Sequence, residues 1–180
     1  CGVLVLEALE SARRRGAPIL AEIAGFATVS DTSNIVNPSA ESMKICMEKA
    51  LADARMTPHD IDYVNAHATG TDQGDRAESR AIFGTFGEAT PVSSLKGHMG
   101  HAMAASGALE MAATIAMMHR KVLIPTLNLD NVDEACQNIR HVLHPEDIPV
   151  TSAIKNNFAF GGVNSCVILR RFENDRTGDR

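Results

Sequence analysis

The sequence lacks a long apolar run, an excess of basic residues and closely spaced cysteines. No apolar stretch among its 180 residues is long enough to span a bilayer, which excludes a transmembrane helix and argues against a membrane partner. The formal net charge is −5. Because binding a phosphate backbone generally needs a concentrated basic face, no nucleic-acid partner is expected. The one basic cluster, Arg13-Arg14-Arg15, is typical of a solvated helix end, and contact with an acidic partner is the alternative.

The four cysteines show no pairing pattern; they are Cys1, Cys46, Cys136 and Cys166. Their spacing indicates neither a disulfide framework nor a zinc site, so no metal is expected. A reducing cytoplasm fits this usage best, and no targeting signal is readable. Cys46 and Cys166 fall on apolar helix and strand patterns. This predicts buried structural thiols and leaves the chain without a convincing nucleophile.

Short apolar runs alternate with segments of helical periodicity, which predicts an α/β fold. Strands are expected at residues 3–7, 19–24, 61–65, 91–95, 151–157 and 163–170, and helices at 38–54, 72–86 and 101–118. The first helix follows a polar loop at 30–37 and is expected to be capped by Asn37. Phe160-Gly161-Gly162 joins the last two strands in a pattern typical of a hairpin. The polar tail from residue 173 is expected to be disordered.

The expected helix over 101–118 is small or apolar on all sides, and Glu110 is the only charged residue between His101 and His119. A helix of this kind is expected to be buried all round, so a single sheet on one face does not suffice. A lone carboxylate on such a helix is costly unless it is paired. The sequence therefore predicts a buried cationic partner for Glu110.

Two stretches, residues 65–71 and 94–101, each have the pattern of a strand end that runs through a small-residue turn into a helix. In open α/β sheets, ligands bind at the carboxyl ends of strands beside helix N-termini. This would place His67, Lys96 and His101 together at the carboxyl-terminal edge of one sheet. A metal bound by His98 and His101 is an alternative, but no third ligand of suitable spacing is evident.

Three motifs carry a resemblance to a known family: His67-Ala-Thr-Gly-Thr71 with Gly74-Asp75 downstream, Lys96-x-x-x-Gly100-His101, and Asn157-Phe-Ala-Phe-Gly-Gly-Val-Asn164. In this order and at these separations they resemble the β-ketoacyl-ACP synthases (3-oxoacyl-[acyl-carrier-protein] synthases) of the His-His class. The likeness covers about residues 2 to 171. It implies the carboxyl-terminal half of a thiolase-like α/β/α layered fold, with a mixed five-stranded sheet, because the family's nucleophilic cysteine lies in the amino-terminal half.

The resemblance also implies an activity and a set of roles. The activity is decarboxylative Claisen condensation of acyl and malonyl thioesters in fatty acid or polyketide chain elongation. A neutral histidine is suited to donating a hydrogen bond to a thioester carbonyl as negative charge develops. The implied assignments are His67 and His101 as these donors, Lys96 as the orienting cation, Glu110 as its buried partner, Phe160 as the gate over the acyl pocket, and Thr69 and Thr71 as hydrogen-bond partners of the phosphopantetheine arm.

The same resemblance implies the partners. No resident cofactor is expected, because phosphopantetheine arrives on the acyl carrier protein. The other implied partners are the amino-terminal half with its nucleophilic cysteine and a second copy in a homodimer. Residues 1–15 would be the last strand and connection of the amino-terminal half, 16–171 the carboxyl-terminal synthase domain, and 172–180 a polar tail. Without the other half, the chain is expected to be inactive.

Three alternatives remain open. One is a non-catalytic subunit similar to a chain-length factor, although such a subunit has no need of His67, His101 and Lys96. Another is the same domain within a modular polyketide synthase. A thiolase proper is less well supported, because its late catalytic cysteine has no counterpart near Cys166. The chain also departs from the family pattern at Ala68, Asp72, Ala159 and Val163; the methyl group at position 159 restricts positive φ in the gate loop.

Overall fold

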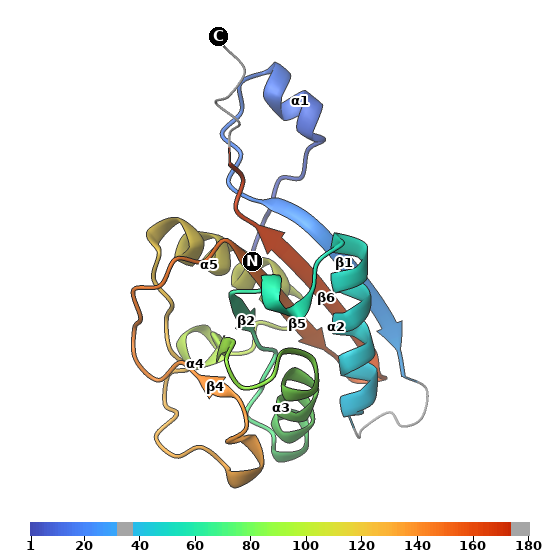
Figure 1. The fold of residues 1–180 in the computed structure, drawn as a ribbon, viewed down its shortest axis with the longest axis vertical. Coiled ribbons are helices and arrows are strands. Elements are labelled where there is room, and N and C mark those ends of the chain that lie inside the picture. Colours follow the sequence, from blue (N-terminus) through green and yellow to red (C-terminus); the bar gives the residue numbers. More distant parts are fainter. Residues whose placement is uncertain (32–37, 174–180) are drawn as a thin grey trace.

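The computed structural model describes residues 1–31 and 38–173. Here six strands form one mixed sheet in the order β1-β6-β5-β2-β3-β4 (Figure 1). The strands are β1 (Glu22–Ser30), β2 (Tyr63–Asn65), β3 (Pro91–Ser93), β4 (Arg140–His141), β5 (Ser152–Phe158) and β6 (Val163–Arg170). Strands β1, β6 and β5 pair antiparallel, and β5, β2, β3 and β4 pair parallel. The α/β class, the mixed sheet and the hairpin of the last two strands are confirmed.

The sheet has one strand more than the five expected. The additional strand is β4, which pairs with Pro91 and Val92 of β3. It lies within the long connection between residues 125 and 149, and two residues are too few to leave a periodic pattern in the sequence.

Helices cover both faces of the sheet. They are α1 (Leu9–Arg14), α2 (Ala40–Ala54), α3 (Asp72–Phe86), α4 (Lys96–Met99) and α5 (Ser106–Arg120), with 3₁₀ turns at Pro58–Asp60, Met103–Ala105 and Glu134–Cys136. One core cluster joins α2 and α3 to one face, and a second joins α5 to the other. Because side chains alternate along β5, Ile154 packs in the first cluster and Ala153 in the second. Among the described residues, no helix is long and apolar enough to cross a membrane.

Strand β1 begins later than expected and passes through Gly25, the residue expected to end it. A Cβ at Gly25 would lie 2.5 Å from the backbone nitrogen of Ala54. The glycine therefore permits close packing of α2 on the sheet, at a point where the β1–β6 register shifts.

The predicted cap of α2 was also wrong. Asn37 and most of the expected loop at 30–37 lie outside the described residues, and the Oγ of Ser39 accepts the backbone N–H of Ser42.

Residues 3–7 do not form the buried strand that their composition predicted. No strand of the described chain pairs with them, and Val3, Val5 and Leu6 are 81%, 85% and 70% exposed. A Cβ at Gly2 would lie 2.7 Å from the Cβ of Ala108, so the chain approaches α5 at Gly2. The polar connection after it contains the short helix α1, which stands apart from the sheet (Figure 1).

The expected helix at 101–118 begins at Ser106 instead of His101. The chain leaves α4 through Gly100 at φ +72°, and Met103 has φ +51°. These two positive φ angles end the short helix and redirect the backbone before α5. Along α5 the buried residues are Ser106, Glu110, Thr114, Met117 and Met118. The other small and apolar positions of α5 are half-buried or exposed, so one face of the helix lacks a second covering layer, as expected for a chain with a single sheet.

Candidate active site

The site lies where two parallel strands end. Strand β2 ends at Asn65 and leads into the loop that carries His67, and β3 ends at Ser93, three residues before Lys96 at the start of α4. The two loops are joined by the Oγ of Ser94, which donates to the carbonyl of Ala68 at 3.0 Å. The expected placement at the carboxyl ends of strands is confirmed for His67 and Lys96. His101 follows α4 in the irregular segment before α5.

The two histidines lie against each other. Their ring centroids are 5.5 Å apart and the rings are nearly perpendicular, at 86°. The ring of Phe158, at the end of β5, lies 6.2 Å from that of His67 on another side. His98 does not join the pair, because its Nε2 lies 2.9 Å from the carbonyl oxygen of Pro125. The predicted convergence of His67 and His101 is therefore present.

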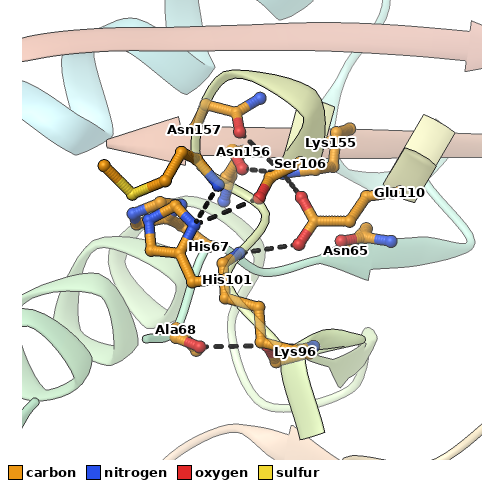
Figure 2. Close-up of polar contacts among 12 residues, drawn as sticks. Asn65, His67, Ala68, Lys96, His101, Ser106, Glu110, Lys155, Asn156 and Asn157 are labelled. Atoms are coloured by element: carbon orange, nitrogen blue, oxygen red, sulfur yellow. Dashed lines mark hydrogen bonds and ion pairs between the residues drawn. The ribbon is translucent and has the colours of Figure 1, made fainter. Parts of the chain in front are cut away.

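The hydrogen bonds of His101 assign the position of its proton. The backbone N–H of Met103 donates to Nδ1 at 3.2 Å, and the Ser106 hydroxyl lies 3.1 Å from the same atom (Figure 2). An Nδ1 that accepts a hydrogen bond carries no proton, so a neutral His101 holds its proton on Nε2. That N–H is then available to a ligand.

His67 is held in the neutral form. Burial lowers the pKa of its imidazole, and the positive charges of Lys96 and Lys155 and the proximity of His101 lower it further, to about 3. Its Nδ1 is buried and has no hydrogen-bond partner among the residues that the structure describes. The arrangement thus places a neutral His67 ring beside the ring of His101.

Lys96 and Glu110 form the buried ion pair that the lone carboxylate predicted. The Nζ of Lys96 lies 2.7 Å from Oε1 of Glu110, and the two side chains are 7% and 0% exposed. Glu110 has a second cation that we did not predict, because the Nζ of Lys155 lies 2.8 Å from its Oε2. The carboxylate therefore lies between two ammonium groups (Figure 2).

Glu78 is a second functional residue that the sequence reasoning missed. Its carboxylate accepts the backbone N–H groups of His67 and Ala68 at 2.8 and 2.7 Å, and the Nδ2 of Asn156 at 3.2 Å. Burial raises the pKa of the Glu78 carboxyl, and these hydrogen bonds oppose that rise. By binding two consecutive N–H groups, Glu78 fixes the loop that presents His67.

Both missed residues had a signal in the sequence. Glu78 lies on the same helical face as the apolar residues Ala81 and Ile82, three and four positions on. Lys155 lies within a segment predicted to be a strand, next to the apolar Ile154. A charge on an apolar face or in a buried strand indicates a buried partner.

The three remaining predicted residues lie at the edges of the site. The hydroxyls of Thr69 and Thr71 are 3.2 Å apart in the loop between His67 and α3. Phe160 is at the turn of the β5–β6 hairpin, two residues beyond Phe158, and is 87% exposed. Gly161 and Gly162, at φ +81° and +73°, close that turn. The structure does not bring Phe160 into the histidine pair.

The thiols of the core are not available as nucleophiles. Cys46 and Cys166 are both 0% exposed, as predicted from their apolar patterns. Burial raises the pKa of the Cys166 thiol. The pKa of Cys46 is lowered by its contact with the Cys166 thiol, but no substrate reaches a fully buried sulfur. Burial also raises the pKa of Cys136.

A cavity of about 240 Å³ lies next to the His67 loop, between α3, β3 and the connection at 126–141. Neither histidine lines it, and neither does Lys96 or Lys155. The hollow therefore borders the loop that carries His67, through Thr71, Glu78 and Ser94, but does not open onto the histidine pair.

Comparison with known proteins agrees with this geometry. Residues 20–130 match the family described as beta-ketoacyl synthase, C-terminal domain. The chain is 38% identical, over 173 residues, to 3-oxoacyl-[acyl-carrier-protein] synthase 2 of Coxiella burnetii, covering 93% of this chain and 42% of that protein. It thus spans less than half the length of the curated relatives that it matches.

Two solved structures are similar throughout. A beta-ketoacyl synthase from Burkholderia phymatum matches with a TM-score of 0.91 and 47% identity, over 93% of this chain and 41% of that one. A type II polyketide ketosynthase, solved in complex with its acyl-carrier protein and bound to a hexaketide, matches with a TM-score of 0.87 and 32% identity, over 93% and 42%. This chain belongs to the beta-ketoacyl synthase family, and the part of the family that it represents is the carboxyl-terminal domain.

Proposed function

We propose that this chain supplies the two-histidine half of a site for decarboxylative Claisen condensation on acyl carrier protein, in fatty acid or polyketide chain elongation. The nucleophilic cysteine would come from an amino-terminal half. We call the chain joined to such a half the assembled synthase. The observation that carries the proposal is the contact of His67 with His101, at 5.5 Å between ring centroids, in surroundings that keep His67 neutral.

The reaction explains why two neutral donors are useful. Cleavage of the bond to the malonyl carboxylate releases carbon dioxide and leaves an electron pair on the thioester as an enolate. The enolate carbon then attacks the acyl thioester on the cysteine; a carbon–carbon bond forms, the carbon–sulfur bond breaks, and the thiolate leaves. Negative charge builds on the malonyl thioester oxygen in the first step. N–H groups already directed at that oxygen stabilise the transition state without reorganising.

His101 supplies such a donor through Nε2, because Nδ1 accepts the backbone N–H of Met103. His67 supplies the other from a loop that Glu78 holds by two backbone N–H groups. Lys96 and Glu110 fix the start of α4 relative to α5, which keeps the segment that carries His101 in place. These roles rest on the contacts of this chain and on the resemblance that the motifs carry.

Three further assignments belong to this proposal. Thr69 and Thr71 would bond the phosphopantetheine arm of the carrier protein, because their hydroxyls lie in the loop that also carries His67. Phe160 would act as a gate over the acyl pocket, since it is an exposed side chain on a glycine turn beside the site. A second copy of the assembled synthase would complete a homodimer, and no resident cofactor is required.

Mass spectrometry of the carrier protein tests the activity. Assembled synthase incubated with acyl- and malonyl-loaded carrier protein should yield a carrier-bound β-ketoacyl chain extended by one malonyl-derived unit, with release of carbon dioxide. A chain-length-factor-like subunit would give a different result. It would form no product as the sole carboxyl-terminal half, and would change product length only when paired with a second, active ketosynthase.

A further inference from the structure

Lys155 is a buried lysine whose main ion-pair partner is Glu110. Burial lowers the pKa of its ammonium group, and the carboxylate of Glu110 opposes that shift. Lys155 lies on β5, the strand next to β2, and is 1% exposed. Three oxygens surround its Nζ: Oε2 of Glu110 at 2.8 Å, the backbone carbonyl of Asn156, and Oδ1 of Asn157 at 3.2 Å (Figure 2). The ammonium group donates hydrogen bonds to the two asparagine oxygens, and its contact with Oε2 of Glu110 is an ion pair without hydrogen-bond geometry.

The buried charges around the histidines form a balanced set. Lys96, Lys155, Glu78 and Glu110 are all buried, and in their ionised forms they contribute two positive and two negative charges. They come from four different elements, α4, β5, α3 and α5. If Lys155 were neutral or absent, the set would carry one uncompensated negative charge. A buried negative charge favours the protonated form of a neighbouring imidazole.

We propose that Lys155 is a positioning residue for the histidine pair, which completes this set of four charges and shares Glu110 with Lys96. The proposal rests on the condensation function proposed above. Under this proposal, Lys155 acts through Glu110 and through its own positive charge. Lys155 does not touch the reacting atoms. A protonated His67 would resemble a fixed positive charge beside the malonyl carboxylate and would oppose loss of carbon dioxide.

The effect on His67 follows from the groups that face it. These are Lys96, Lys155 and His101, while Glu78 binds its backbone N–H. Asp75 of α3 also faces Lys96, and it is only partly buried. Burial contributes most to the lowered pKa of His67, and the charge of Lys155 acts in the same direction. Removing that charge therefore raises the pKa of His67.

A titration without substrate tests this directly. Histidine ring NMR signals, from assembled synthase labelled with ¹³C at the histidine Cε1, are followed from pH 8 to pH 4, with His67→Asn used for assignment. Wild-type His67, with a pKa of about 3, should be no more than about a tenth protonated at pH 4, whereas a rise of about one pH unit in Lys155→Met and Lys155→Gln should leave it about half protonated or more. Lys155→Gln keeps an N–H donor for Glu110. The exposed Lys49→Met, on α2, is the matched control and should leave the midpoint unchanged.

The rate profile gives the second readout. Below the raised midpoint, condensation by both Lys155 variants should fall about tenfold per pH unit, whereas wild type and Lys49→Met should not show this fall in the same range. A protonated fraction of His67 at pH 4 that equals the wild-type fraction in both variants would overturn the proposal, even if both were less stable. If neither variant folds, a wild-type His67 midpoint near 6.5, the ordinary value, still overturns the proposal.

The two readouts separate this proposal from the one on which it rests. A wild-type protein that makes no β-ketoacyl product contradicts the proposed function. The substrate-free titration would still decide whether Lys155 controls the charge state of His67.

Discussion

Glu110→Gln should be among the most destabilising single-atom changes that this chain allows. The glutamine keeps the volume of the side chain but removes the charge that lies 2.7 Å from Lys96 and 2.8 Å from Lys155. At an effective dielectric constant of about 20, each contact represents roughly 6 kcal/mol of attraction. Desolvation of the three groups offsets much of this in the native protein. The variant keeps the desolvation of the two lysines and loses their attraction to the carboxylate.

Breaking a buried pair of this kind typically costs about 3–5 kcal/mol, which is a large part of the stability of an ordinary domain. Urea unfolding, followed by circular dichroism at one fixed protein concentration, measures the difference. The matched control is Glu48→Gln, which breaks the exposed 3.7 Å pair with Lys44 and should change stability by less than about 1 kcal/mol. Equal, small losses in both variants would refute the buried cluster as described.

Three further predictions concern the chain alone and its acid response. The isolated chain should show no condensation in a carrier-protein assay; turnover abolished by Cys46→Ala or Cys166→Ala would contradict this. It should also self-associate in equilibrium sedimentation and bind a hydrophobic dye, because Val3, Val5 and the outer face of α5 are exposed; a monodisperse monomer without dye binding would refute this. Finally, the folded pKa of His67 is about 3, below its ordinary 6.5, so the unfolded chain takes up the proton first as pH falls. Stability should therefore drop by roughly 2 kcal/mol between pH 6.5 and 5, relative to His67→Asn, when both are unfolded in urea; parallel pH profiles would exclude a neutral, buried His67.

The sequence predicted the regular elements well where one clear pattern governed them. The helix at 72–86 was predicted at its observed bounds, because its apolar residues repeat with helical spacing up to a glycine. The buried stripe of α2 followed in the same way, since Met43, Cys46 and Met47 form one face. The loops with His67 and Lys96 were predicted because strand ends and small residues are both local signals.

The remaining features depend on contacts between distant residues. Gly25 looks like the end of a strand, and only the approach of Ala54 shows why it lies within one. His101 and Glu110 were placed on a single helix because small residues run without a break between them, whereas positive φ angles at Gly100 and Met103 divide the segment. Lys155 could not be assigned a partner because Glu110 is 45 residues away in the sequence and joins it only through the packing of α5 on β5.

Release of labelled carbon dioxide from malonyl-loaded carrier protein tests the central claim most directly. In assembled synthase, His67→Ala and His101→Ala should each lower the rate by about a hundredfold or more, which is the effect of losing one preorganised donor. Lys49→Met serves as the control and should retain the wild-type rate. Losses below tenfold in both histidine variants would contradict the account, because they would show that the pair supports the structure and not the reaction.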